Sequence, residues 1–326
     1  MIRVRTPEVQ GFETEHASIM RKLAPECMVL LKSDGTLPLR HAGKIALYGN
    51  GARNTIKGGT GSGDVNVRHF TTVEEGLINA GFEITTGNWL DSYDSLIREA
   101  RAAFDRKSEE EAAELGIDPA FYAMGRIMPE PEYDLMTEGE GDTALYILAR
   151  NSGECVDRKS VEGDIRLSAT EIRDILALHE KYEHFILVLN VGGMVDLTPV
   201  QKVDNILLIS QLGTATGDAF ADVLLGRSYP SGKLTMTWAP IDAYPSTEGF
   251  GHPDDTPYRE GIYVGYRYFD KADVKPLYPF GFGLGYTEFS IDSGKVTVRD
   301  NIITVSARVT NIGNAPGKEV VQVYYS

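Results

Sequence analysis

Four short apolar runs limit the folds that are open to this chain. Each is too short to cross a bilayer, which takes roughly 18 apolar residues. Continuous apolar runs of this length are typical of strands that are buried on both faces, as in a parallel sheet covered by helices. The runs are KIALYGN (44–50), ALYILAR (144–150), FILVLNVGG (185–193) and NILLISQLG (205–213).

Helical patterns alternate with these runs. Residues 91–115 have a long charged helical pattern, and Ser168 with Glu171 forms a capping box ahead of an amphipathic helix that runs to 182. Strands that alternate with helices predict an α/β fold with a mostly parallel sheet. Further expected elements are a helix at 16–31, a helix and strand at 73–84, an irregular segment at 116–143, a helix at 214–226 and a strand within 228–238.

The pattern changes after about residue 240. Residues 290–326 alternate apolar and polar side chains with a period of two, and turn residues stand at 299–301 and 313–314. This pattern predicts an antiparallel β-sandwich of about three strands. Three strands rarely cover both inner faces of a sandwich, so we expect the domain to continue beyond the given sequence.

Charge and composition exclude several classes of function. The net charge is −15, and nucleic-acid binding rests on clustered Lys and Arg, so we expect no nucleic-acid partner and favour a neutral or cationic ligand. Two cysteines and six scattered histidines show no metal-ligand spacing, so neither a metal nor a cofactor is expected. The N-terminus lacks the apolar region of a signal peptide, which favours the cytoplasm and no membrane partner unless a signal lies outside this sequence.

Two glycine-rich segments follow the first apolar run. GNGARN (49–54) lacks the third glycine of a dinucleotide fingerprint, and KGGTGSGDVN (57–66) lacks the Gly-Lys-Ser/Thr ending of a phosphate loop. The second segment is either a surface loop or a loop whose backbone approaches a ligand, with Asp64 and Asn66 as polar contacts. No Gly-x-Ser-x-Gly elbow is present, which argues against a serine hydrolase.

A charged loop, ARNSGECVDRKSVEGD (149–164), leaves the end of one predicted strand. Ligands of parallel sheets lie at the carboxyl ends of strands, so this position draws attention to Glu154. A general acid needs a carboxyl that holds its proton near neutral pH; Asp157 would raise the pKa of Glu154, and Arg158 would lower it. From the residues alone, a general acid and a solvated charged loop both remain open.

The stretch RNSGECVDR (150–158) resembles the acid/base loop of glycoside hydrolase family 3, whose pattern is Ser-Gly-Glu-Gly-x-Asp-Arg. Cys155 stands where that pattern has glycine, and its effect on the loop cannot be predicted from the sequence. Other segments resemble the same family in the same order, and together they span nearly the whole chain. They are 28–39, 44–66, 73–84, 163–171, 220–238, 258–270, 277–289 and 309–326.

The resemblance implies a fold and a division into domains. The expected fold class is α/β: a six-stranded, mostly parallel α/β sandwich followed by a partial all-β fibronectin type III-like segment. The sandwich domain would occupy residues 1–240, a connecting segment 241–289, and the start of the fibronectin type III-like domain 290–326. Family members normally place a (β/α)8 barrel before the sandwich, so a sandwich near Met1 implies the N-terminal part of a circularly permuted member.

The resemblance also implies an activity. The intact protein would be a retaining β-glycosidase, with β-glucosidase as the favoured activity, acting on β-linked gluco-oligosaccharides or on aryl and alkyl glucosides. Glu154 would be its general acid/base. The nucleophile would be an aspartate of the (β/α)8 barrel, in a Ser-Asp-Trp-like context that is missing here, so the chain alone should be inactive. The supporting or substrate-binding candidates are Asp157, Arg158, Ser62, Asp64, Tyr258 and Glu260.

Two other functions remain open at this stage. The first is a carbohydrate-binding or scaffolding module that has kept the fold and lost catalysis, although Glu154, Asp157 and Arg158 argue against it. The second is nucleotide binding at residues 49–54. The sequence leaves the choice of sugar, the linkage and homo-oligomer formation undetermined.

Overall fold

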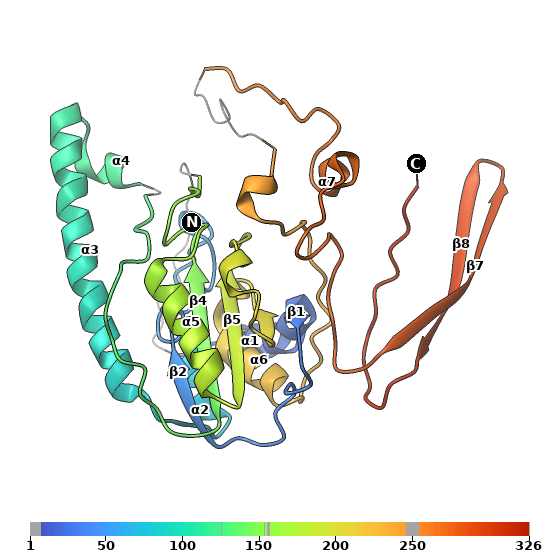
Figure 1. The fold of residues 1–326 in the computed structure, drawn as a ribbon, viewed down its shortest axis with the longest axis horizontal. Coiled ribbons are helices and arrows are strands. Elements are labelled where there is room, and N and C mark those ends of the chain that lie inside the picture. Colours follow the sequence, from blue (N-terminus) through green and yellow to red (C-terminus); the bar gives the residue numbers. More distant parts are fainter. Residues whose placement is uncertain (1–7, 125, 153, 155–156, 246–253, 326) are drawn as a thin grey trace.

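A computed structural model describes residues 8–124, 126–152, 154, 157–245 and 254–325. They form a six-stranded sheet covered by helices and a separate two-stranded sheet (Figure 1). The helices are α1 (Gly11–Leu23), α2 (Val73–Asn79), α3 (Gly87–Leu115), α4 (Pro119–Ala123), α5 (Ala169–Lys181), α6 (Thr216–Leu224) and α7 (Tyr266–Ala272). The strands are β1 (Val29–Lys32), β2 (Lys44–Tyr48), β3 (Glu83–Ile84), β4 (Thr143–Arg150), β5 (His184–Val191), β6 (Ile206–Leu208), β7 (Phe289–Arg299) and β8 (Ile302–Asn311).

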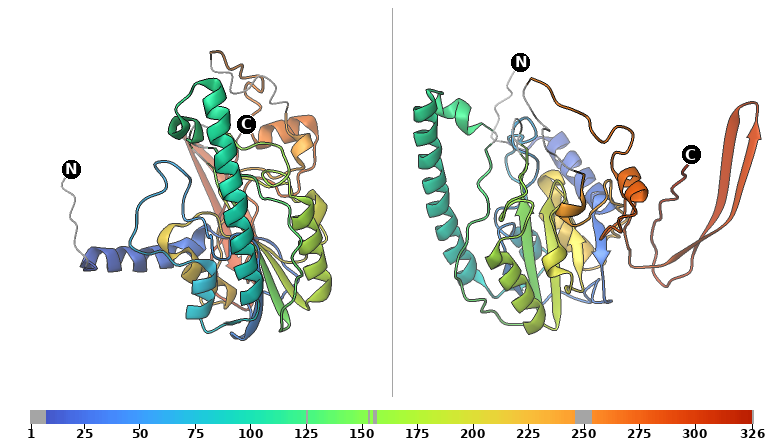
Figure 2. Two further views of the ribbon diagram at one scale, coloured as in Figure 1. Left: turned by 90° about the vertical axis from the view of Figure 1, so that its left-hand side faces the viewer. Right: turned by 45° about the horizontal axis from the view of Figure 1, so that its top comes forward.

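The large sheet has the strand order β1-β6-β5-β4-β2-β3. All neighbouring strands are parallel except β1, which is antiparallel to β6. Helix α5 lies on one face and α1, α2 and α6 lie on the other, while α3 runs along the edge formed by β2 and β3 (Figure 2). The predicted α/β class with a six-stranded, mostly parallel sheet is therefore confirmed.

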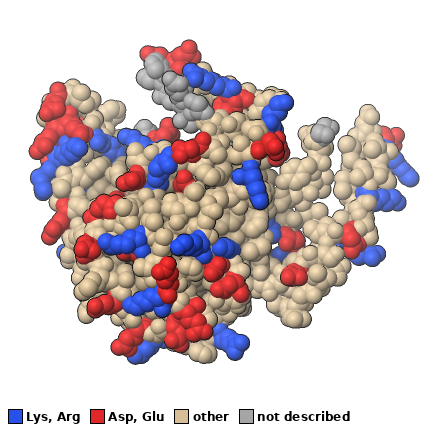
Figure 3. All heavy atoms as spheres, in the orientation of Figure 1, with Lys and Arg blue, Asp and Glu red and all other residues tan. Residues whose placement is uncertain are grey.

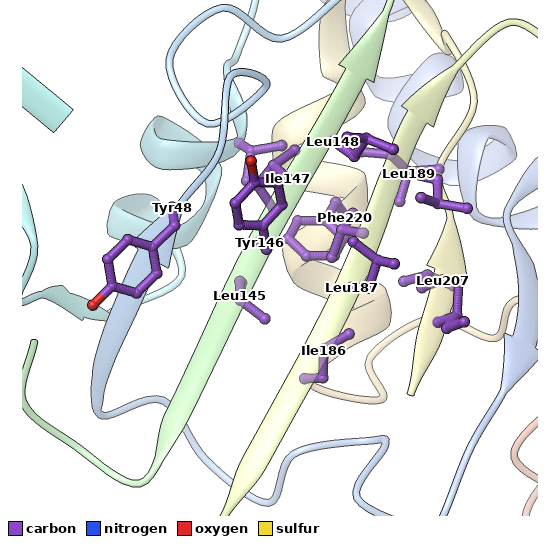
Figure 4. Packing of buried hydrophobic residues seen from close by; sticks show 14 of the residues in the cluster. Tyr48, Leu145, Tyr146, Ile147, Leu148, Ile186, Leu187, Leu189, Leu207 and Phe220 are labelled. Atoms are coloured by element: carbon purple, nitrogen blue, oxygen red, sulfur yellow. The ribbon is translucent and has the colours of Figure 1, made fainter. Parts of the chain in front are cut away.

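Strands β4 and β5 form the centre of the core. Every residue after the first in each strand is buried, and the two strands pair along their full length. Figure 4 shows side chains from β4, β5 and β6 in one cluster with Phe220 of α6. Burial on both faces is the reason that these strands read as continuous apolar runs rather than as alternating ones.

Local signals set the ends of the main helices where the sequence places them. The Ser168 hydroxyl accepts a hydrogen bond from the Glu171 N–H (3.2 Å), and the Glu171 carboxylate accepts one from the Ser168 N–H (2.8 Å), which is the predicted capping box. Helix α3 ends at Leu115, and Gly116 follows with a φ of 65°, a conformation that favours glycine. The expected helix over 91–115 is confirmed and begins earlier, at Gly87.

The expected helix over residues 16–31 is wrong in its second half. Helix α1 ends at Leu23 and is followed by a short 3₁₀ turn, Ala24–Cys27, that contains Pro25. Proline lacks the N–H that a helix interior needs, so the helix cannot continue through it. The apolar residues beyond it form β1, at the edge of the sheet.

Two expected strands near the C-terminal end are also wrong. Within 228–238 the structure has no strand. A bend at Thr235–Met236 separates the backbone hydrogen bonds of Leu234 from those of Trp238, so no continuous pairing forms. Leu234 donates to the Phe282 carbonyl (2.8 Å), and Trp238 exchanges backbone hydrogen bonds with Tyr278. Residues 316–325 belong to no strand, so the described part of the predicted sandwich consists of β7 and β8 alone.

Charged side chains of both signs are interspersed on the face shown in Figure 3. The described residues include no helix that is both long and apolar enough to span a membrane.

Candidate active site

The charged loop (149–164) begins with the last two residues of β4, at the carboxyl end of that strand. From β2 the chain passes through α2 to β3 on one side, whereas from β4 it passes through α5 to β5 on the other side. The direction of winding therefore reverses between β2 and β4. In open parallel sheets, ligands bind outside the carboxyl ends of the strands at such a reversal.

Glu154 lies in this loop with its side chain exposed. Its carboxylate oxygen Oε1 accepts hydrogen bonds from the backbone N–H of Ser62 (3.0 Å) and from the Ser62 hydroxyl. The Glu154 N–H points to the Thr60 carbonyl oxygen at 3.4 Å. The structure thus brings together two predicted site residues, Ser62 and Glu154, from segments 92 positions apart.

The glycine-rich segment 57–66 forms the surface on which Glu154 rests. Gly61 has a φ of +99°, and a Cβ atom added there would lie 2.6 Å from Cδ of Glu154. A side chain at this position would therefore displace the carboxylate. Of the two interpretations left open for this segment, the structure favours a close backbone approach, but to Glu154 itself.

Two further contacts join this segment to the start of the charged loop. The Thr60 N–H donates to the Ser152 carbonyl (2.9 Å), and the Asn151 amide donates to the Thr60 hydroxyl (2.5 Å). Asp64 does not reach Glu154 and pairs with Lys57 within its own segment. Asn66 is exposed.

The hydrogen bonds from Ser62 have an electrostatic consequence. They stabilise the charged carboxylate, so the pKa of Glu154 is lowered, with the Ser62 hydroxyl as the larger cause and the Ser62 N–H as the second. A proton donor near neutral pH needs the opposite shift, which arises from burial or from a neighbouring carboxylate. In this chain the contacts of Glu154 therefore favour its charged carboxylate form.

Arg158 holds the second half of the loop. Its Nε donates to Asp164 (2.8 Å) and its Nη1 to the Met194 carbonyl (2.9 Å), which ties the loop to the segment after β5. Burial lowers the pKa of Arg158, and the Asp164 carboxylate opposes that shift. Asp157 is exposed and lines a separate cavity of about 180 Å³ with Phe104. Cys155 lies outside the described residues.

Tyr258 and Glu260 lie elsewhere. Tyr258 is 83% exposed, and Glu260 lines a cavity of about 330 Å³ together with Tyr263 and Lys271. That cavity shares no lining residue with the loop that carries Glu154. Among the described residues, the structure therefore does not bring these two candidates to Glu154.

The glycines of GNGARN serve packing against β4. Gly49 has a φ of +88°, and an added Cβ would lie 2.5 Å from the Ile147 carbonyl oxygen. At Gly51 an added Cβ would lie 2.7 Å from Cγ2 of the same isoleucine. These contacts explain the two glycines without a nucleotide.

Sequence reasoning missed Glu130, which connects both ends of the charged loop. The Asn50 amide donates to the Glu130 carboxylate (2.8 Å) and to the Ala149 carbonyl (3.1 Å), and its oxygen accepts from the Ala149 N–H (2.6 Å). The backbone N–H of Glu130 donates to the Gly163 carbonyl (2.9 Å). Tyr93 donates to the other carboxylate oxygen (2.5 Å). The only signal in the sequence is the polar Asn50, two positions after a buried strand.

Arg150 and Glu171 form a buried ion pair beneath this loop. Their side chains are 5% and 0% exposed, and Nη2 of Arg150 lies 2.7 Å and 2.6 Å from the two carboxylate oxygens. Nε of Arg150 also donates to the Asp164 carbonyl (2.9 Å). The pair thus joins β4, the end of the charged loop and the start of α5.

Glu130 leads to a prediction about stability. Burial raises its pKa from an ordinary 4.5 to about 7, and the neighbouring Glu171 carboxylate adds to the shift. Between these two pH values the folded protein holds a proton that the unfolded chain has lost. The contribution of Glu130 to the free energy of unfolding should therefore fall as pH rises from about 4.5 to about 7.

In the Glu130→Gln variant the slope of the free energy of unfolding against pH should lack this contribution, because glutamine does not titrate. Urea unfolding at pH 5 and at pH 7.5, followed by circular dichroism, measures the difference. An unchanged slope in the variant would show that Glu130 titrates alike in the folded and unfolded chains.

No metal site accompanies these groups: nowhere in the described ranges do three or more His, Cys, Asp or Glu side chains gather to hold an ion.

Comparison with known proteins gives a consistent result. The model of the glycosyl hydrolase family 3 C-terminal domain matches residues 28–286. Beta-glucosidase A of Butyrivibrio fibrisolvens is 37% identical over 96% of this chain and 42% of its own length. Thermostable beta-glucosidase B of Acetivibrio thermocellus is 34% identical over 95% of this chain and 38% of its own length.

Solved structures agree with the sequence comparison. The structure of beta-glucosidase 3B from Thermotoga neapolitana in complex with glycerol has a TM-score of 0.75 and 32% sequence identity. The match covers 94% of this chain and 42% of that one. The chain thus spans less than half the length of the curated relatives and of the solved structure described above.

Proposed function

This chain belongs to glycosyl hydrolase family 3, and from that premise we propose that it supplies one half of the active site of a retaining β-glucosidase. The observation that carries the proposal is the position of Glu154. Its carboxylate stands at the reversal point of the sheet, held by Ser62 from a second loop. The relatives named above are β-glucosidases, which supports a β-linked glucoside as substrate.

In the proposed mechanism Glu154 acts twice. It first donates a proton to the oxygen of the leaving group while a second carboxylate attacks the anomeric carbon, and it then removes a proton from the water that releases the sugar. The two carboxyl groups of a retaining enzyme stand about 5–5.5 Å apart. The second carboxylate would be an aspartate of a (β/α)8 barrel in the full-length protein.

The lowered pKa of Glu154 is compatible with a first step in which it donates a proton and a second step in which it accepts one. The contacts within the chain keep Glu154 in the deprotonated form in which it enters the second step. For the first step it must be protonated, and a negatively charged aspartate facing it across the bond would raise its pKa. Once that aspartate is bonded to the sugar its charge is gone, and the pKa of Glu154 falls again.

The proposal is tested with the intact enzyme and with the chain 1–326 alone. The intact enzyme should hydrolyse 4-nitrophenyl β-glucoside and release the β-anomer of glucose first, as proton NMR can follow. The chain alone should show no turnover, because one carboxyl group cannot serve both as nucleophile and as acid. Release of the α-anomer first, or turnover by the chain alone that is lost in Glu154→Gln, would contradict the mechanism.

Titration calorimetry of the chain alone with glucose and cellobiose distinguishes the rival function. A half-site should bind these sugars weakly. Firm binding without a barrel would instead favour a non-catalytic carbohydrate-binding module.

A further inference from the structure

One polar side chain interrupts the apolar run of β5. Asn190 stands one position before the end of this strand and is 0% exposed. A buried amide costs free energy unless its polar groups are hydrogen-bonded. The side chain of asparagine carries one acceptor oxygen and two N–H donors, so a satisfied Asn190 needs three partners or nearly so.

The partners of Asn190 lie in two loops. Its Oδ1 accepts from the Ile56 N–H (2.6 Å), and its Nδ2 donates to the carbonyls of Ile56 (3.0 Å) and Ser210 (2.6 Å). Ser210 has a φ of 51°, a conformation that costs free energy for a residue other than glycine. The hydrogen bond from Asn190 offsets part of that cost. A single side chain thus ties the segment after β2 and the segment after β6 to β5.

The contact with Ile56 anchors the glycine-rich segment 57–66, which follows it directly. In the sheet β4 lies between β2 and β5, so the chain that leaves β2 crosses the carboxyl end of β4 to reach Asn190. The Gly213 N–H adds a second anchor at the Lys57 carbonyl (2.9 Å). The segment that starts from these anchors is the one on which Glu154 rests.

The glycine-rich segment connects its base to its tip. The two sides of the segment touch, because a Cβ added at Gly58 would lie 2.7 Å from the Gly63 carbonyl oxygen. Lys57 and Asp64 form an ion pair between the same two sides. A loop closed in this way leaves its tip little freedom relative to its base. The position of Ser62 at the tip is therefore determined by the anchors at the base.

We propose that Asn190 is a positioning residue for the acid/base carboxylate of Glu154. It holds the base of the glycine-rich segment at Ile56, and Ser62 at the tip holds the carboxylate. The inference rests on the proposed function, in which Glu154 transfers the proton. Because Asn190 contacts backbone groups and not Glu154 itself, its contribution is to the geometry of proton transfer.

The test uses the intact enzyme and two substrates that differ in their need for an acid. In a retaining enzyme kcat/KM reports the steps up to departure of the leaving group. In Asn190→Ala, kcat/KM for cellobiose should fall about tenfold to a hundredfold, the loss expected when a catalytic group is misplaced by about 1 Å. For 2,4-dinitrophenyl β-glucoside it should stay within about threefold, because this leaving group departs without an acid.

The ratio of the two kcat/KM values separates positioning from a structural role. A smaller fraction of folded enzyme lowers both values equally and leaves their ratio unchanged. Equal losses on both substrates, or no loss on cellobiose, would overturn the positioning role of Asn190.

Asn205→Ala is the matched control. Asn205 is also a buried asparagine (2% exposed) that holds two backbone segments, donating to the Phe185 carbonyl (3.3 Å) and accepting from the Asp34 N–H (3.1 Å). These contacts lie at the start of β5, at the opposite end of the sheet from Glu154. The variant should lose stability without changing the ratio of the two kcat/KM values.

A double-variant cycle tests the route through the glycine-rich segment. Gly61→Ala places a Cβ against the carboxylate of Glu154 and should by itself cause the same selective loss on cellobiose. In the Asn190→Ala background Gly61→Ala should have much less effect, because the carboxylate is already displaced. Losses that add fully in the double variant would overturn the proposed route and the proposal with it.

A milder variant covers the case in which Asn190→Ala does not fold. Asn190→Ser keeps a hydroxyl that can satisfy one of the freed backbone groups, and it should show the same selective loss to a smaller degree. An unaltered intact enzyme that hydrolysed no β-glucoside would instead contradict the proposed function, which is a separate outcome.

Discussion

Replacing Glu154 by glutamine should lower kcat of the intact enzyme on cellobiose by about 10²–10⁴-fold, the range that positioned general acids contribute. Glutamine keeps the shape of the side chain and a hydrogen-bonding oxygen for Ser62, but it cannot transfer a proton. The leaving group of cellobiose is a sugar alkoxide, which departs poorly without protonation. Steady-state kinetics on cellobiose measures the effect.

The dependence on the leaving group makes this result diagnostic. The phenolate of a phenol with a low pKa leaves without help from an acid. With 2,4-dinitrophenyl β-glucoside the variant should therefore lose much less of the rate of the first step. Added azide should then recover part of the second step, because an anionic nucleophile needs no general base. Glu162→Gln, which alters an exposed glutamate of the same loop, should leave both substrates unaffected. Equal losses on good and poor leaving groups would mean that Glu154 is not the acid.

Breaking the buried ion pair should give the largest effect on stability. The Arg150→Met variant leaves Glu171 buried and uncompensated, and this typically costs about 3–5 kcal/mol of the free energy of unfolding. The same change also frees the Asp164 carbonyl at the end of the charged loop. Urea unfolding followed by circular dichroism measures the loss.

Two comparisons separate the ion pair from simple loss of packing. The double variant Arg150→Met/Glu171→Met removes both charges and should be less destabilised than Arg150→Met alone. Lys44 and Glu140 form an exposed pair with an N–O distance of 2.7 Å, and Lys44→Met should cost less than about 1 kcal/mol. A double variant that loses as much as the sum of the two single variants would contradict strong coupling between Arg150 and Glu171.

The parts of the fold that could be predicted from the sequence are those fixed by local signals. The apolar run 144–150 became β4 because burial on both faces leaves no alternation, and Ser168 with Glu171 set the start of α5. The position of Glu154 after a strand followed from the same reasoning. That Glu154 is the acid/base stays a prediction.

What could not be predicted depends on long-range contacts. Glu130 stands in a segment without hydrophobic periodicity. Its role in holding the charged loop becomes visible only in the fold, where it forms hydrogen bonds with Asn50 and Gly163. For the segment that contains Gly61 the sequence leaves a surface loop and a close backbone approach to a ligand both open, and only the fold shows that the missing side chain leaves room for the carboxylate of Glu154. No sequence period encodes either relationship.

The sheet of β7 and β8 also affects how the chain behaves at high concentration. Its apolar side chains are exposed in the described structure, and each strand has one edge without a partner strand there. Free backbone N–H and C=O groups on an apolar edge are a template for pairing with other chains. The chain 1–326 kept by itself would therefore tend to self-associate through this sheet. Its solubility would then be determined by the exposed sheet of β7 and β8 and not by the buried core. The exposed apolar residues are Ile291, Val296, Val298, Ile302, Ile303, Val305 and Val309.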